Sequence, residues 1–137
     1  FVVNTILKEA DLFCPNSVWI NFTIYQISDG VVLNYGAQLI TGGGSSKITI
    51  GENTQVGPGT IICTVSHEIG DSNKRAGDRV YKDIVIEKGV WIGANSTIIS
   101  GVTIAHGCVI GAGALVNKNT EPNGLYVGVP AKRIRDL

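Results

Sequence analysis

Residues 86–120 read IEKGVWIGANSTIISGVTIAHGCVIGAGALVNKNT, and an aliphatic residue recurs in this stretch at every sixth position. The recurring residues are Ile86, Ile92, Ile98, Ile104, Ile110 and Val116. A helix would space its apolar residues about 3.6 apart, and a half-buried strand would alternate every second residue. A period of six fits neither element alone. It fits a short strand followed by a corner, repeated, with one large aliphatic side chain pointing inward per strand.

The residues between the aliphatic positions support the same interpretation. Three places after each of them stands a residue that tolerates a left-handed backbone, in the order Gly89, Asn95, Gly101, Gly107, Gly113 and Asn119. Four places after each stands a small or β-branched residue, in the order Val90, Ser96, Val102, Cys108, Ala114 and Thr120. Six consecutive matches at three positions predict an all-β fold, a parallel β-helix of hexapeptide repeats.

The same period runs through residues 27–62 in two shorter blocks. The aliphatic positions of these blocks are Ile27, Leu33 and Leu39, then Ile50, Val56 and Ile62. Between the blocks, the turn-rich residues 42–47 shift the register. If three hexapeptides close one triangular coil, the chain forms four coils. We expect one domain over 1–137, with an irregular cap or first coil at 1–26, repeats at 27–120, and an exit turn with a basic tail at 121–137.

Residues 67–83 interrupt the repeats with a strongly charged segment. Eight of these seventeen residues are charged, out of 22 charged residues in the whole chain. So many charges cannot lie in an aliphatic core. We therefore expect the segment to protrude as a loop into solvent or over a functional site.

Composition argues against several classes of protein. A net charge of zero and a pI near 6.9 are unlike a general nucleic-acid binder. The sequence has no run of 18 apolar residues that could span a membrane, and no signal peptide is visible. Cys14, Cys63 and Cys108 are odd in number and lack CxxC spacing, which argues against a disulfide framework or a zinc site and fits a reducing cytoplasm. We expect Cys108 to be a small buried residue, and we expect no metal.

Four runs of the sequence are similar to a known family. They are VWIGA at 90–94, GVTI at 101–104, VIGAGA at 109–114 and GVPAKRIR at 128–135. In order and spacing they resemble the hexapeptide acyltransferases, especially the galactoside, maltose and capsule or lipopolysaccharide O-acetyltransferases. The resemblance implies a left-handed parallel β-helix, a homotrimer, acetyl-CoA as the donor, and active sites between adjacent subunits.

The resemblance implies that His67 is the catalytic residue. In the family, the catalytic histidine stands at the start of such a charged loop and takes the proton of the acceptor hydroxyl. The chemistry suits the residue, because an imidazole titrates near neutral pH, at about 6.5. The alternative is a solvated loop histidine. His106 is expected to point outward as a surface residue, and two histidines are too few for a three-histidine zinc site.

The resemblance also implies residues that bind acetyl-CoA. Backbone groups of Ala94 and Ala112 would meet the pantetheine amides. Trp91 would border the pocket, or lie partly buried at the subunit interface. The remaining implied positions are Asn117, Lys118, Lys132 and Arg135. The three basic residues among them would contact the phosphates, or else they form a solvated surface and tail.

Asn34 resembles an acceptor-binding asparagine of the galactoside enzymes. The family's acceptor-binding aspartate has no match, because Thr41 and the insertion after it stand there. The expected function is an acetyl-CoA-dependent O-acetyltransferase acting on a saccharide, in surface polysaccharide synthesis. The alternatives are an N-acetyltransferase of an amino-sugar nucleotide and a non-catalytic β-helix scaffold subunit. Cys63 as an acyl-accepting nucleophile is the least favoured interpretation.

Overall fold

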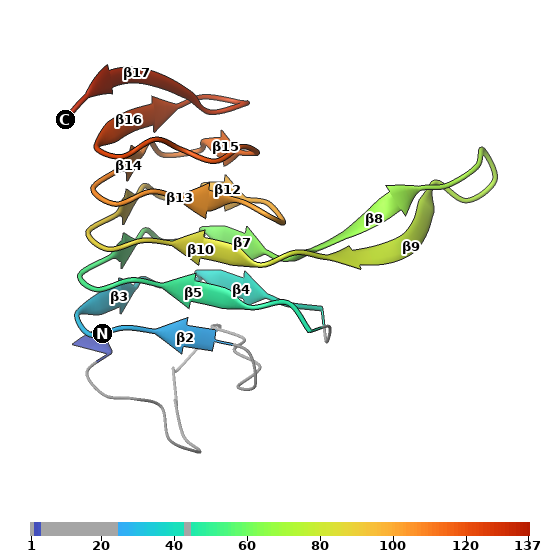
Figure 1. The fold of residues 1–137 in the computed structure, drawn as a ribbon, viewed down its shortest axis with the longest axis horizontal. Coiled ribbons are helices and arrows are strands. Elements are labelled where there is room, and N and C mark those ends of the chain that lie inside the picture. The colour runs from blue at the N-terminus through green and yellow to red at the C-terminus, as the bar shows by residue number, and fades with distance from the viewer. Residues whose placement is uncertain (1, 4–24, 43–44) are drawn as a thin grey trace.

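The computed structural model describes residues 2–3, 25–42 and 45–137, which wind into a β-helix with one protruding arm (Figure 1). The coils have three faces, each a stack of short strands. The first face holds β2 (Tyr25–Ile27), β5 (Ile48–Ile50), β10 (Ile84–Ile86) and β13 (Thr103–Ile104). The second holds β1 (Val2–Val3), β3 (Val31–Leu33), β6 (Gln55–Val56), β11 (Trp91–Ile92), β14 (Val109–Ile110), β16 (Gly124–Val127) and β17 (Lys132–Asp136). The third holds β4 (Gln38–Ile40), β7 (Ile61–Cys63), β12 (Thr97–Ile98) and β15 (Leu115–Val116).

Successive coils stack in register, so the interior is a column of aliphatic side chains. Ile92 pairs with Val56 below it and with Ile110 above it, in parallel ladders. The six aliphatic residues that recur between 86 and 116 expose at most 1% of their surface. The small residues predicted for the interior, from Val90 to Thr120, are also buried. The predicted repeats are therefore confirmed, and four complete coils form as counted. None of the described residues forms a helix that could cross a membrane.

Each coil has three corners, named here in chain order: the first corner follows the first face, the second follows the second, and the third follows the third. Five predicted left-handed residues adopt a positive φ, namely Gly89, Asn95, Gly101, Gly107 and Gly113. The sixth, Asn119, was predicted wrongly: it is not among the residues with positive φ. Its side-chain oxygen accepts a hydrogen bond of 2.8 Å from the Thr103 N–H, and the next left-handed residue is Asn123, at φ 52°. The Thr120 hydroxyl likewise accepts from the Ala105 N–H at 2.8 Å, while the Thr120 N–H donates to the Thr103 carbonyl at 3.0 Å. Side-chain acceptors here supplement the backbone hydrogen bonds.

The structure adds detail at both ends of the repeat region. The first coil begins with β2, at Tyr25, inside the segment predicted as an irregular cap or first coil. Val2–Val3 pairs antiparallel with β3, and most of the predicted cap lies outside the described residues. The segment predicted as an exit turn and tail is ordered into two strands. β16 continues the second face as a further parallel strand, and β17 folds back antiparallel to it.

The charged segment is an antiparallel hairpin, and it does protrude as predicted (Figure 1). Its strands are β8 (Val65–Ile69) and β9 (Ala76–Tyr81). The ladder pairs Val65 with Tyr81 and Ser66 with Val80. The hairpin leaves the helix at the third corner, between β7 and β10. The expected loop is therefore a two-stranded arm, in which the ladder between β8 and β9 pairs the backbone groups of a largely exposed segment.

Candidate active site

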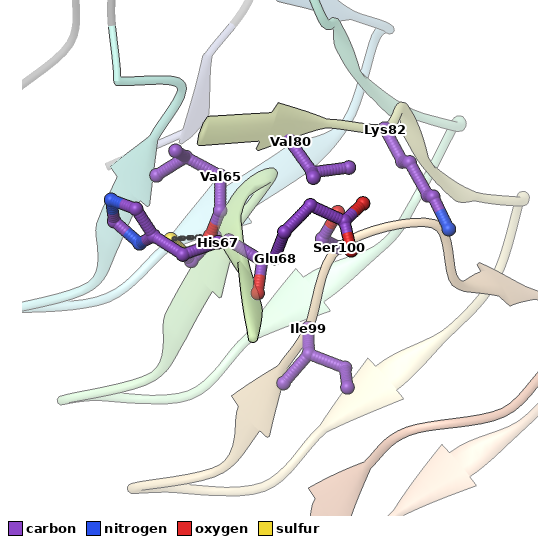
Figure 2. A pocket seen from close by; sticks show the side chains of 9 residues that line it. Val65, His67, Glu68, Val80, Lys82, Ile99 and Ser100 are labelled. Atoms are coloured by element: carbon purple, nitrogen blue, oxygen red, sulfur yellow. Dashed lines mark hydrogen bonds between the residues drawn. The ribbon is translucent and has the colours of Figure 1, made fainter. Parts of the chain in front are cut away.

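His67 lies on β8, at the base of the hairpin, where it lines a hollow of about 430 Å³ (Figure 2). The hollow lies between the hairpin and the third corner of the next coil. The lining side chains that are polar or can ionise are those of Cys63, His67, Glu68, Lys82 and Ser100. His67 is exposed and pairs across the hairpin with Arg79. The predicted base thus stands at a concave surface that can hold a small molecule.

Cys63 lines the same hollow, at the end of β7. Its thiol donates a hydrogen bond of 3.4 Å to the carbonyl of Val65. This contact occupies the thiol proton with the backbone of the hairpin base. Cys63 thus helps to fix the point where the chain leaves the helix.

Three of the residues predicted to bind the donor lie around the second corner. Trp91 lies on β11, where it pairs with Gln55 in the coil before and with Val109 in the coil after. It is 59% exposed. Ala94 and Ala112 occupy the same corner in successive coils, and the Gly113 N–H donates to the carbonyl of Ala94 at 2.8 Å. These corners are in direct contact. At this corner Ala112 is exposed and Ala94 is half-buried.

Asn34 stands at the second corner of the first coil. Its side-chain nitrogen donates to the carbonyl of Val56 at 2.9 Å, one coil further on. The side-chain nitrogen therefore has a structural partner, and the residue as a whole is exposed. The corner places Asn34 in line with Ala94 and Ala112.

The predicted basic residues are exposed, as a phosphate-binding role requires. Asn117 and Lys118 lie at the third corner of the last complete coil, whereas Lys132 and Arg135 lie on β17. Within the described residues, the ion pairs are Arg133 with Asp136 and His106 with Glu87. Neither lysine, nor Arg135, is taken up by these contacts.

Apart from Lys132 and Arg135 on β17, the predicted site residues divide between two corners of the same chain. His67, Asn117 and Lys118 belong to the third corner, while Trp91, Ala94, Ala112 and Asn34 belong to the second corner and the strand before it. The strands of the third face separate the two groups. A single chain therefore does not bring His67 and the second-corner residues together.

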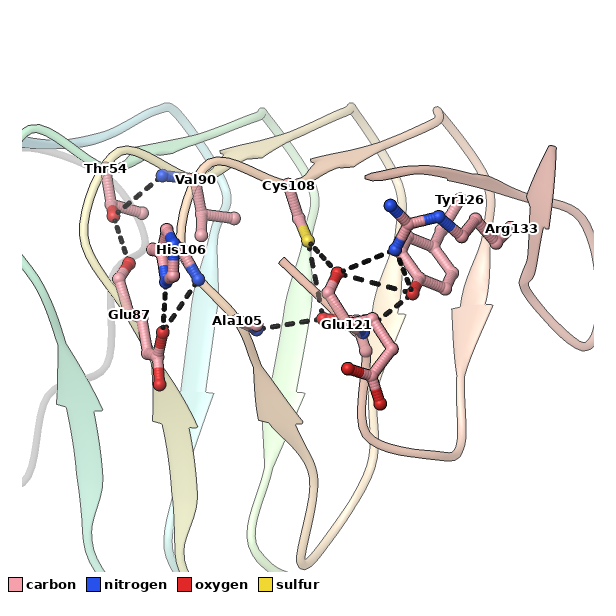
Figure 3. Close-up of polar contacts among 10 residues, drawn as sticks. Thr54, Glu87, Val90, Ala105, His106, Cys108, Glu121, Tyr126 and Arg133 are labelled. Carbon is pink, nitrogen blue, oxygen red and sulfur yellow. Dashed lines mark hydrogen bonds and ion pairs between the residues drawn. The ribbon is translucent and has the colours of Figure 1, made fainter. Parts of the chain in front are cut away.

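His106 lies at the first corner, away from the hollow (Figure 3). Its side chain is 47% exposed, which confirms the predicted surface position. Its backbone N–H donates to Glu87 Oε2 at 2.8 Å, and its ring Nδ1 lies 3.1 Å from the same oxygen. These two hydrogen bonds, the backbone one first, lower the pKa of Glu87. Within the described ranges, no three metal-ligating side chains gather around a common point.

Cys108 is buried, as the repeat pattern predicted. Its thiol donates to the carbonyl of Glu121 at 3.1 Å (Figure 3). The residue therefore also ties the last complete coil to the segment that follows it.

Comparison with known proteins decides the family. Residues 83–118 match the model of the bacterial transferase hexapeptide family, described as six repeats. The chain belongs to the hexapeptide-repeat acyltransferases. The β-helix of this hexapeptide-repeat protein is left-handed, as in its structural neighbours.

Three matches illustrate the relationship. A candidate acetyltransferase of Schizosaccharomyces pombe is 44% identical over 90 residues, which cover 66% of this chain and 44% of that protein. The galactoside O-acetyltransferase of Escherichia coli is 29% identical over 140 residues, covering 97% of this chain and 68% of the enzyme. A hexapeptide-repeat acetyltransferase of Vibrio cholerae, solved in complex with acetyl coenzyme A, superposes with a TM-score of 0.77. It is 35% identical, and the match covers 84% of this chain and 61% of that one. This chain thus spans about half to two thirds of the length of these relatives.

Proposed function

We propose that this hexapeptide-repeat protein transfers an acetyl group from acetyl-CoA to a hydroxyl of a saccharide. The observation that carries the proposal is the position of His67 at the hollow where the hairpin leaves the helix. The expected setting is surface polysaccharide synthesis in a reducing cytoplasm. The galactoside O-acetyltransferase and the Vibrio cholerae acetyltransferase support this chemistry by similarity.

In the proposed mechanism, His67 takes the proton of the acceptor hydroxyl as the oxygen attacks the thioester carbonyl. The carbonyl oxygen becomes an oxyanion, which a backbone N–H stabilises. Collapse of the tetrahedral intermediate breaks the carbon–sulfur bond, and the protonated His67 returns its proton to the departing thiolate. The products are the O-acetyl ester and coenzyme A. Atoms and charge balance without a metal or a further co-reactant.

The donor would lie along the second corner. There, Ala94 and Ala112 would offer the amides of pantetheine those backbone groups that the hydrogen bonds between coils leave unused, near the exposed ring of Trp91. Lys118, Lys132 and Arg135 would neutralise the phosphates at the nucleotide end. Their exposure and freedom from the ion pairs named above support this role.

A direct assay tests the function. With acetyl-CoA and a neutral sugar, the protein should release free thiol at a rate proportional to enzyme concentration. Acetyl-dephospho-CoA, which lacks the 3′-phosphate, should show a higher KM, because one anionic partner of the basic residues is missing. Absence of thiol release with a broad panel of sugars would reject the transferase proposal. An equal KM for both donors would reject only the role of the basic residues.

We further propose that the protein is a homotrimer with its active sites between subunits. The separation of His67 from the second-corner residues supports this arrangement, because a neighbouring chain can supply the missing group. A closed three-fold ring would make three equivalent sites. Light scattering at micromolar concentration should therefore give three times the mass of one chain. A monomer that is active at the same concentration would contradict the shared site.

A further inference from the structure

Two opposite charges line the hollow beside His67. Glu68 comes from β8, and Lys82 follows the end of β9. In Figure 2, the carboxylate of Glu68 points toward the side of Lys82, whereas the ring of His67 points the other way. The two ion pairs found among the described residues involve neither Glu68 nor Lys82. Both charges are therefore available to a molecule bound in the hollow.

The backbone and the aliphatic stem of Lys82 both contact the helix. Its backbone N–H donates to the carbonyl of Thr64 at 3.1 Å, at the base of the hairpin. Its aliphatic stem lies over Gly101, where an added Cβ would come within 3.1 Å of the Lys82 Cδ. Gly101 has a φ of +85°, so a side chain is disfavoured there for both reasons. The stem of the exposed Lys82 side chain thus lies against the corner of the next coil, at the rim of the hollow.

Ser100 adds a polar group without a partner. Its hydroxyl oxygen is buried and forms no hydrogen bond with any described residue, although the residue lines the hollow. Buried hydroxyls in proteins are almost always paired. An occupant of the hollow can supply such a partner if the Ser100 side chain turns toward it. The walls between these polar groups are aliphatic, from Val80 and Ile99.

We propose that Glu68 and Lys82 determine the charge of the acceptor, and that they select a neutral, polyhydroxylated ring. The inference rests on the proposed function, and it concerns the part of the acceptor that lies away from the reacting hydroxyl. Sugar hydroxyls can donate to the carboxylate of Glu68 and accept from the ammonium of Lys82. An acidic ring is attracted by Lys82 but repelled by Glu68, and the reverse holds for a basic ring.

The test compares two acceptors that share one ring, methyl glucoside and methyl glucuronide, with acetyl-CoA as the donor. The quantity measured is kcat/KM for the acidic acceptor divided by kcat/KM for the neutral one. In Glu68→Gln this ratio should rise about tenfold, because a repulsive charge is removed. In Lys82→Gln it should fall about tenfold, because the attractive charge is removed. The wild-type protein should prefer the neutral acceptor.

Matched controls lie on the same hairpin, outside the hollow. Asp78→Asn and Lys74→Gln change the net charge by the same amounts and should leave the ratio within about twofold, since exposed charges at a distance are screened by salt. The inference is supported if the ratio rises in Glu68→Gln and falls in Lys82→Gln, while both control variants keep the wild-type ratio. An active wild type whose ratio does not respond to either hollow variant overturns the inference and leaves the transferase proposal intact. Absence of turnover with every acceptor overturns both.

Discussion

The His67→Ala protein should fold and bind coenzyme A, yet transfer acetyl groups about 10²- to 10⁴-fold more slowly than wild type. The fold should survive because His67 is exposed on the hairpin and contributes nothing to the aliphatic column. Coenzyme A binding should survive because the proposed partners of the donor lie elsewhere. The loss should fall on kcat, since without a base the hydroxyl attacks while still carrying its proton. Single-turnover thiol release measures this step directly.

His106→Ala is the matched control for this experiment. It removes the other histidine of the chain, from a corner remote from the hollow, and it should turn over like wild type. The variant does remove a hydrogen bond to Glu87, so its stability should be checked separately. A His67→Ala protein that binds coenzyme A and turns over near the wild-type rate would show that another group is the base.

Replacing Ile98 by Ala should lower the free energy of unfolding by about 3 kcal/mol. Ile98 is fully buried in the third coil, between Ile62 below and Val116 above. The deleted atoms leave a cavity that the ladders on either side prevent from collapsing. Urea denaturation at one fixed protein concentration measures the effect, because dissociation of an oligomer would otherwise enter the midpoint.

Ile99→Ala makes the same chemical change one residue further along. Ile99 is 38% exposed at the third corner, so this variant should lose about 1 kcal/mol or less. Similar losses for Ile98→Ala and Ile99→Ala would mean that the inward column does not carry the stability of the coil.

The regular coils were predictable because every sixth residue occupies the same buried position in each repeat. Ile86 and Ile104, for example, stack on the same face in successive coils. The repeated residue type therefore indicates a repeated buried environment. Prediction failed where the repetition ends. Asn119 has the residue type of a corner, but no complete coil follows it, and its side chain instead bonds to the exposed edge of β13. Nothing in the residue type distinguishes these two uses of an asparagine.

The candidate site was predictable in part for a similar reason. His67 stands at a position that the family resemblance marks, at the start of a charged segment. Glu68 and Lys82 were hidden among eight charges of that segment, because only the pairing of β8 with β9 shows which of them face the hollow. Arg133 was equally hidden between Lys132 and Arg135. Its guanidinium donates to the carbonyls of Glu121, Pro122 and Asn123, at 3.2, 3.0 and 3.3 Å.

The reversed last strand has a consequence for association between molecules. At the end of a stack of parallel coils, the last strands have backbone groups with no further coil to pair with. The coil of another molecule could pair with this edge, and repeated addition would build a filament. Here β17 runs antiparallel to β16, and all five of its residues are exposed. Four of the five are charged, namely Lys132, Arg133, Arg135 and Asp136. Arg133 also occupies three carbonyls beneath it. We therefore expect the charge on β17 and its reversed direction to disfavour the addition of a second molecule to this edge.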